Sequence, residues 1–247
     1  MKRNSFAYRH IGPKAVDVDQ MLSTIDVDSI DTLIDQTVPS AIRADKELDL
    51  APAMTEAEFA THIGALGEMN SVFKTYIGMG YHPTFLPGVI QRNILENPGW
   101  YTAYTPYQAE IAQGRLEALM NYQTMVVDLT GMELANASLL DEATAVAEAM
   151  SMFYGAMPRA KKKAGANKFF VDQNTFPQSL DLLKTRTEPI GVELVLGDYR
   201  DFEPTAEFFG ALVQYPNADG SIEDYRAFGA ACTEAEVQLV VAADIMS

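Results

Sequence analysis

The feature that most constrains the fold is an alternation of short apolar runs with helical segments after residue 160. Four runs have the composition of buried strands: Lys168–Val171, Gly191–Leu196, Phe209–Tyr215 and Gln238–Ala243. Helical patterns lie between them at Pro177–Arg186 and Ile222–Glu236. Strands that alternate with helices are typical of βαβ units, which build parallel sheets. The sequence therefore predicts an α/β fold with a mainly parallel sheet.

The chain stops at Ser247, directly after the last apolar run. Parallel sheets are normally covered on both faces, so a strand of this kind needs more chain around it. We therefore expect an incomplete sheet and a fragment of a longer protein. Such a fragment would expose a contiguous apolar surface and tend to associate.

The first part of the chain has helical patterns instead. Thr55 and Glu58 have the spacing of a capping box, and Pro87 suits a first helical turn. The predicted helices are Thr55–Met69, Pro87–Leu95, Tyr107–Leu129 and Asp141–Phe153. We therefore predict two domains: a mainly helical arm and wrap over residues 1–155, and a truncated α/β sheet domain over residues 156–247.

Composition narrows the range of functions. The formal net charge of −16 disfavours nucleic acid and anionic membranes, because phosphates would be repelled. No apolar run approaches the length of a membrane-spanning helix. The single cysteine, Cys232, excludes an internal disulfide and is expected to be a small buried apolar residue. We expect a cytoplasmic protein. The run Lys161–Lys163 is expected to be a solvated turn rather than a phosphate site.

Residues 94–115 form the stretch richest in possible binding groups. Its aromatic residues are Trp100, Tyr101, Tyr104 and Tyr107, and they lie around two prolines, Pro98 and Pro106. A rigid loop held by a long helix is a common way to present binding side chains. Aromatic residues also seal cores and subunit interfaces, so the residues alone leave both interpretations open.

Five motifs occur in chain order at Phe6–Pro13, Leu33–Pro39, Tyr76–Tyr81, Leu119–Met125 and Leu134–Thr144. Together they resemble the P-protein of the glycine cleavage system, a glycine decarboxylase dependent on pyridoxal phosphate (PLP). The chain departs from the family at two places. Phe176 stands where the family usually has His before Pro-Gln, and His82 begins a segment that is Thr-rich in the family. No role is carried over to those two positions.

The resemblance implies the fold of the aspartate-aminotransferase-like PLP enzymes. It also implies two such halves in a full chain that forms a dimer, with PLP in the second, C-terminal half. The full enzyme would decarboxylate glycine and pass the aminomethyl group to the lipoylated carrier protein. This fragment alone would be inactive and would carry no Schiff-base lysine. The alternative is that this half is a non-catalytic module that stabilises the PLP-bearing half.

The resemblance also suggests which residues approach the substrate. The candidates that would face the cofactor held by the other half are Tyr101, Tyr104, Thr105, Tyr107 and Gln108. No catalytic residue is expected within this chain. His10, His62 and His82 are too scattered along the sequence to indicate a metal site.

Three acidic residues occupy positions that would hold the cofactor in this fold. Asp141 and Glu142 fall where a helix start would bind the cofactor phosphate, and their charges would repel it. We favour simpler roles, in which Asp141 caps the helix and Glu142 complements its dipole. Asp244 follows a strand where the fold has an acid that pairs with the pyridinium nitrogen. Here we expect a vestigial or structural role.

Overall fold

The computed structural model describes residues 6–44 and 46–247. The chain divides into two compact units, one up to Lys74 and one comprising Thr75–Ser247. The proposed domain boundary between residues 155 and 156 stays a prediction.

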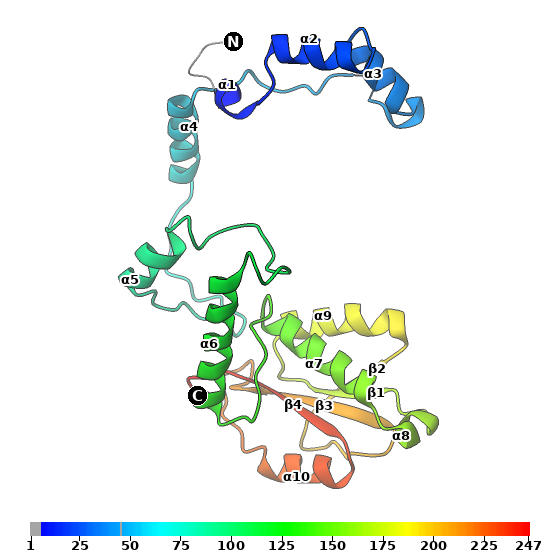
Figure 1. The fold of residues 1–247 in the computed structure, drawn as a ribbon. Helices are drawn as coiled ribbons and strands as arrows, with labels where there is room; N and C mark the ends of the chain where they lie inside the picture. The colour runs from blue at the N-terminus through cyan, green and yellow to red at the C-terminus, as the bar shows by residue number, and fades with distance from the viewer. Residues whose placement is uncertain (1–5, 45) are drawn as a thin grey trace. The chain divides into compact units, whose positions relative to one another are not determined.

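The first unit consists of short helices joined by extended segments (Figure 1). They are α1 (Phe6–His10), α2 (Ala15–Thr24), α3 (Ile30–Thr37), the 3₁₀ turn η1 (Ser40–Ile42) and α4 (Glu56–Glu68). The predicted capping box is confirmed: the Thr55 hydroxyl accepts from the Glu58 N–H, and the Thr55 N–H donates to the Glu58 carboxylate. Among the described residues of this unit, only Leu22 is buried, so the unit has almost no core of its own.

The second unit holds the sheet. Before the sheet come α5 (Gly88–Ile90), the π-helical turn η2 (Gln91–Leu95), α6 (Gln113–Thr130), α7 (Glu142–Ala156) and α8 (Arg159–Lys163). The sheet region contains β1 (Lys168–Asp172), α9 (Pro177–Thr187), η3 (Glu188–Ile190), β2 (Glu193–Gly197), β3 (Phe208–Tyr215), α10 (Arg226–Glu234) and β4 (Gln238–Ala243). All four predicted strands are present.

The sheet is wholly parallel, in the order β2-β1-β3-β4. Helices α7 and α9 cover one face and α10 covers the other (Figure 1). Successive side chains along a strand point to opposite faces of the sheet, so the buried side chains form one core on each face. Phe169 packs with Met150 of α7 and Leu183 of α9, whereas its neighbour Phe170 packs with Phe228 of α10. The predicted α/β class is confirmed.

Three local predictions need correction. The long helix begins at Gln113 rather than Tyr107, because the residues after Pro106 form turns before the helical hydrogen bonds start. The last crossover helix likewise begins at Arg226, not Ile222. Lys161 is not in a solvated turn: it lies in α8, is buried, and its ammonium donates to the carbonyls of Ala235 and Glu236. Those carbonyls follow the end of α10, where helix-end oxygens lack partners within the helix.

The prediction for the single cysteine is confirmed. Cys232 is fully buried against the sheet, and burial raises the pKa of its thiol to about 11. Lys184 of α9 is exposed and pairs with Asp181 on the same helix. Within the described residues, no helix is both long and apolar enough to cross a membrane.

Candidate functional site

A pocket of about 850 Å³ lies at the carboxyl edge of the sheet, within the second unit. It is lined by the segments that follow β1, β3 and β4, by the first turn of α7, and by residues 80–84. The strand order reverses between β1 and β3, because the chain adds β2 on one side and β4 on the other. In open α/β sheets, ligands bind outside the carboxyl ends of strands at such a switch point.

The start of α7 brings two predicted residues to this edge. Asp141 caps the helix, and its Oδ1 accepts from the Thr144 N–H at 2.7 Å, which lowers the pKa of the Asp141 carboxyl. Glu142 follows in the first turn and lines the pocket. Its Oε1 accepts from Nε2 of Gln214, a buried residue of β3, at 2.8 Å. The expected cap is therefore present, and Glu142 has a partner that the sequence did not reveal.

The third predicted position, Asp244, lies in the same pocket directly after β4. Its Oδ1 accepts from the Met246 N–H, and its Oδ2 lies 3.1 Å from Nε2 of His82. Both hydrogen bonds lower the pKa of the Asp244 carboxyl, and the bond from the Met246 N–H has the larger effect. The same contact raises the pKa of the His82 imidazole. Asp244 thus contacts His82, in the segment of residues 80–84, while the vestigial or structural role expected for it stays a prediction.

The two departures from the family pattern meet at this pocket. His82 lines it beside Asp244, and Phe176, the residue directly before α9, lines it too. The Phe176 ring packs against Tyr81 with centroids 5.6 Å apart. Gly80 has a φ of +101°, and a Cβ there would lie 2.3 Å from the Phe176 ring, so only glycine allows this contact.

The aromatic candidates lie elsewhere. Tyr101, Tyr104, Thr105, Tyr107 and Gln108 are all exposed, and none of them lines the pocket. The Tyr104 hydroxyl donates to Gln108 at 3.2 Å, and Arg115 of α6 donates to the Tyr104 carbonyl. This segment is therefore held by its own polar contacts while its rings remain open to solvent.

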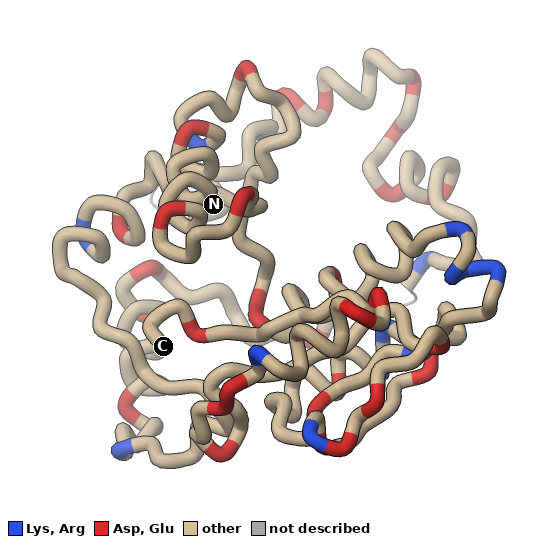
Figure 2. Tube along the Cα trace, turned by 90° about the horizontal axis from the view of Figure 1, so that it is seen from below, with Lys and Arg blue, Asp and Glu red and all other residues tan. Residues whose placement is uncertain are grey.

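The pocket does not suit a phosphate-bearing cofactor. Its lining includes the carboxylates of Glu142, Asp219 and Asp244, but no lysine or arginine among the residues that the structure describes. Acidic positions outnumber basic ones along the described chain as well (Figure 2). A dianion beside Glu142 would meet a like charge at the helix start, where the fold would otherwise supply free N–H groups.

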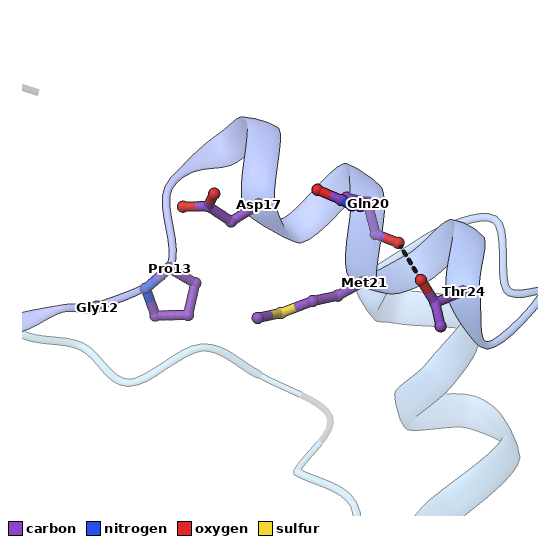
Figure 3. Close-up of a pocket in the computed structure, with 6 residues that line it drawn as sticks. All are labelled: Gly12, Pro13, Asp17, Gln20, Met21 and Thr24. Carbon is purple, nitrogen blue, oxygen red and sulfur yellow. Dashed lines mark hydrogen bonds between the residues drawn. The ribbon is translucent and has the colours of Figure 1, made fainter.

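A second hollow, of about 440 Å³, lies beside α2 in the first unit (Figure 3). Its one charged side chain, Asp17, accepts from the Lys14 N–H, and Thr24 donates to the Gln20 carbonyl. These groups are already bonded within the helix, so this hollow offers little for a ligand.

A parallel sheet with its pocket at the carboxyl edge, beside a helix start, defines the class of the protein as an open α/β fold. A crystal structure of glycine decarboxylase (P-protein) of the glycine cleavage system, in inhibitor-bound form, superposes with a TM-score of 0.80. That match has 29% sequence identity and covers 95% of this chain and 53% of the other. Residues 8–247 match the model of the glycine cleavage system P-protein family. The chain belongs to this family.

Curated relatives are closer in sequence. The chain is 58% identical to the glycine dehydrogenase (decarboxylating) of Flavobacterium johnsoniae and 59% identical to that of Christiangramia forsetii, over 247 residues in each case. All of this chain is covered in both matches, but only 26% of each relative. The chain therefore spans about a quarter of the length of the curated relatives it matches.

Sequence reasoning missed three lining residues. Phe176 and His82 could be noticed in the sequence, because both depart from the family pattern. The sequence did not indicate that both line one pocket. Gln214 gave none, because a glutamine in an apolar strand does not reveal which helix start it will contact. Its role depends on the packing of α7 over β3.

Proposed function

We propose that this chain is the N-terminal, non-PLP-carrying part of a glycine dehydrogenase (decarboxylating). The longer protein would decarboxylate glycine and transfer the aminomethyl group to the lipoylated carrier protein. The observation that carries the proposal is the family match over residues 8–247, together with relatives nearly four times longer. PLP, when bound by the other half, would supply an electron sink for the carbanion left by loss of CO₂.

Within that protein this chain would carry no catalytic residue. Glu142 stands at the helix start that would otherwise receive the phosphate, and within the described part of the chain no lysine lines the pocket. The exposed tyrosines after Trp100 fit a role at the entrance to a site completed by the other half. Tyr101, Tyr104 and Tyr107 all keep at least two fifths of their surface exposed, so their rings are available to such a partner.

The absence of covalent PLP binding is tested by incubating the purified chain with PLP, reducing with borohydride and measuring intact mass. The longer protein serves as the positive control. We expect a stoichiometric pyridoxyl adduct on the longer protein and only scattered, substoichiometric labelling here. A stoichiometric adduct at one lysine of this chain would move the catalytic role into this half.

The role of the tyrosines is tested by Tyr104→Phe and Tyr107→Phe in the longer protein. We expect turnover to fall while the elution volume on size exclusion stays unchanged. Tyr122→Phe, on α6, is the matched control. Unchanged turnover in both variants would favour the alternative, a structural module that only stabilises the PLP-bearing half. We further propose that the longer protein is cytoplasmic and that it forms a dimer. Light scattering of the longer protein tests the dimer.

A further inference from the structure

A segment without helix or strand forms one wall of the pocket at the carboxyl edge, and we name residues 78–84 the strap. The strap residues that line the pocket are Gly80, Tyr81, His82 and Thr84. Within the strap, the Tyr81 N–H donates to the Gly78 carbonyl at 3.0 Å. Among the described residues, one hydrogen bond joins the strap to another element, between His82 and Asp244. The strap is therefore attached to the sheet edge at a single polar point.

The other attachment of the strap is apolar. The Tyr81 ring packs against Phe176, and the backbone at Gly80 touches the same ring. Burial is the main cause that raises the pKa of the Tyr81 phenol, so Tyr81 stays neutral at physiological pH. This contact therefore does not change with pH, and His82 is the strap residue whose charge can change there.

The partners of the His82 ring depend on its protonation. Nε2 lies 3.1 Å from Oδ2 of Asp244, and Nδ1 lies 3.4 Å from the Pro83 carbonyl oxygen. Both oxygens can only accept, so each ring nitrogen needs a hydrogen to make its bond. An imidazolium ion has two such hydrogens, whereas a neutral imidazole has one. The geometry of the ring is therefore complete only in the charged form.

The charges around His82 favour the same form. Three carboxylates line the pocket with it, from the first turn of α7, the turn after β3 and the end of β4: Glu142, Asp219 and Asp244. Tyr215, at the end of β3, is the other titratable side chain from these elements. Within the described residues, no lysine or arginine lines the pocket to oppose an imidazolium ion.

We propose that the strap is a pH-dependent gate on this pocket, closed while His82 is an imidazolium ion and released when His82 loses its proton. The proposal goes beyond the proposed function and does not depend on it. The sign follows from linkage. The Asp244 hydrogen bond, the largest cause, raises the pKa of His82 in the closed strap. Closure is therefore complete below the unperturbed value of about 6.5 and is lost as pH rises through the raised pKa.

The size of the effect is set by exposure. The side chains of His82 and Asp244 are 65% and 36% exposed, and exposed ion pairs are weak. We therefore expect the ratio of open to closed strap to rise about two- to fivefold across the titration of His82. The Tyr81 contact with Phe176 keeps part of the population closed at high pH.

The test is paramagnetic relaxation enhancement in the ¹⁵N-labelled chain, with a nitroxide on Thr84→Cys. Cys232 is fully buried, so the label goes to the strap. The reporters are the backbone amides of Ala243 and Asp244, measured between about pH 5 and about pH 9. We expect the enhancement to fall as pH rises, with the midpoint of the His82 imidazole titration followed in the same samples. A constant enhancement, or a midpoint away from that of His82, would overturn the proposal.

Variants locate the switch. His82→Gln can donate one hydrogen bond but cannot become charged, so the enhancement should no longer depend on pH. Asp244→Asn should reduce the dependence, because its amide oxygen accepts without carrying a charge. His62→Gln, at an exposed position of α4, is the matched control and should keep the full dependence. The amide spectrum of each variant reports whether it is folded. A full pH dependence in folded His82→Gln would contradict the proposal.

Discussion

Residues 168–243 and residues 75–140 belong to the same unit but differ in how far their apolar side chains are buried. In the first region, the side chains of β1 and β3 are almost all buried between α7, α9 and α10. In the second, Ala112 is the only buried residue, and large side chains such as Phe85 and Tyr107 are exposed. One unit can therefore contain a region with a buried core and a second region whose apolar side chains are not covered by the rest of that unit.

The largest expected effect is in the sheet core. Leu212→Ala should destabilise the unit by about 2–5 kcal/mol, because it removes fully buried contacts and leaves a cavity. Leu134→Ala, at an exposed position of the second region, is the matched control and should change stability by less than about 0.5 kcal/mol. Urea unfolding of both variants measures the difference. Similar losses would remove the distinction between the regions.

A smaller effect is expected where α8 meets the end of α10. Lys161→Met keeps most of the apolar stem but removes the donor to the Ala235 and Glu236 carbonyls. We expect a loss of about 1–2 kcal/mol in urea unfolding. Lys162→Met, one residue later on the exposed side, should be neutral. A neutral Lys161→Met would show that water replaces the ammonium without cost.

The cap of α7 should show a pH dependence with a defined sign. The Thr144 N–H lowers the folded-state pKa of Asp141 below its unfolded value. Its contribution is therefore complete above the unfolded value of about 3.9 and is lost as pH falls through the folded pKa. Asp141→Ala should be less stable than the parent chain at pH 7, and the gap should shrink as the pH falls below the unfolded value. A gap that stays constant as the pH falls would exclude the capping carboxylate as its origin.

The smallest expected effect concerns the contact between His82 and Asp244. Both groups are exposed, so Asp244→Asn should hardly change stability. It should instead lower the pKa of His82, which the Asp244 hydrogen bond raises in the parent chain. NMR titration of the imidazole measures this, with His62 as the internal reference. An unchanged His82 pKa would mean that the contact is not populated in solution.

The difference between the buried sheet and the exposed residues 75–140 also explains which features could be predicted from the sequence. The four strands were predictable because each is a short run of apolar residues between turn signals, and burial against neighbouring helices follows from that pattern. The cap at Asp141 was predictable from its local sequence. The start of α6 was not, because Pro106 and the residues after it allow either turn or helix. The contact of Gln214 with Glu142 and that of Lys161 with Glu236 each join residues more than seventy positions apart. Local sequence patterns carry no information on such pairs.

Backbone hydrogen exchange, followed by mass spectrometry, tests the central contrast most directly. The isolated chain and the proposed longer protein are compared under the same conditions. We expect strong protection of residues 168–243 in both samples, because their hydrogen bonds open only with the core. Residues 75–140 should exchange quickly in the isolated chain and become protected in the longer protein, where the rest of the protein covers their apolar surface. Equal protection of the two regions in the isolated chain would contradict the account.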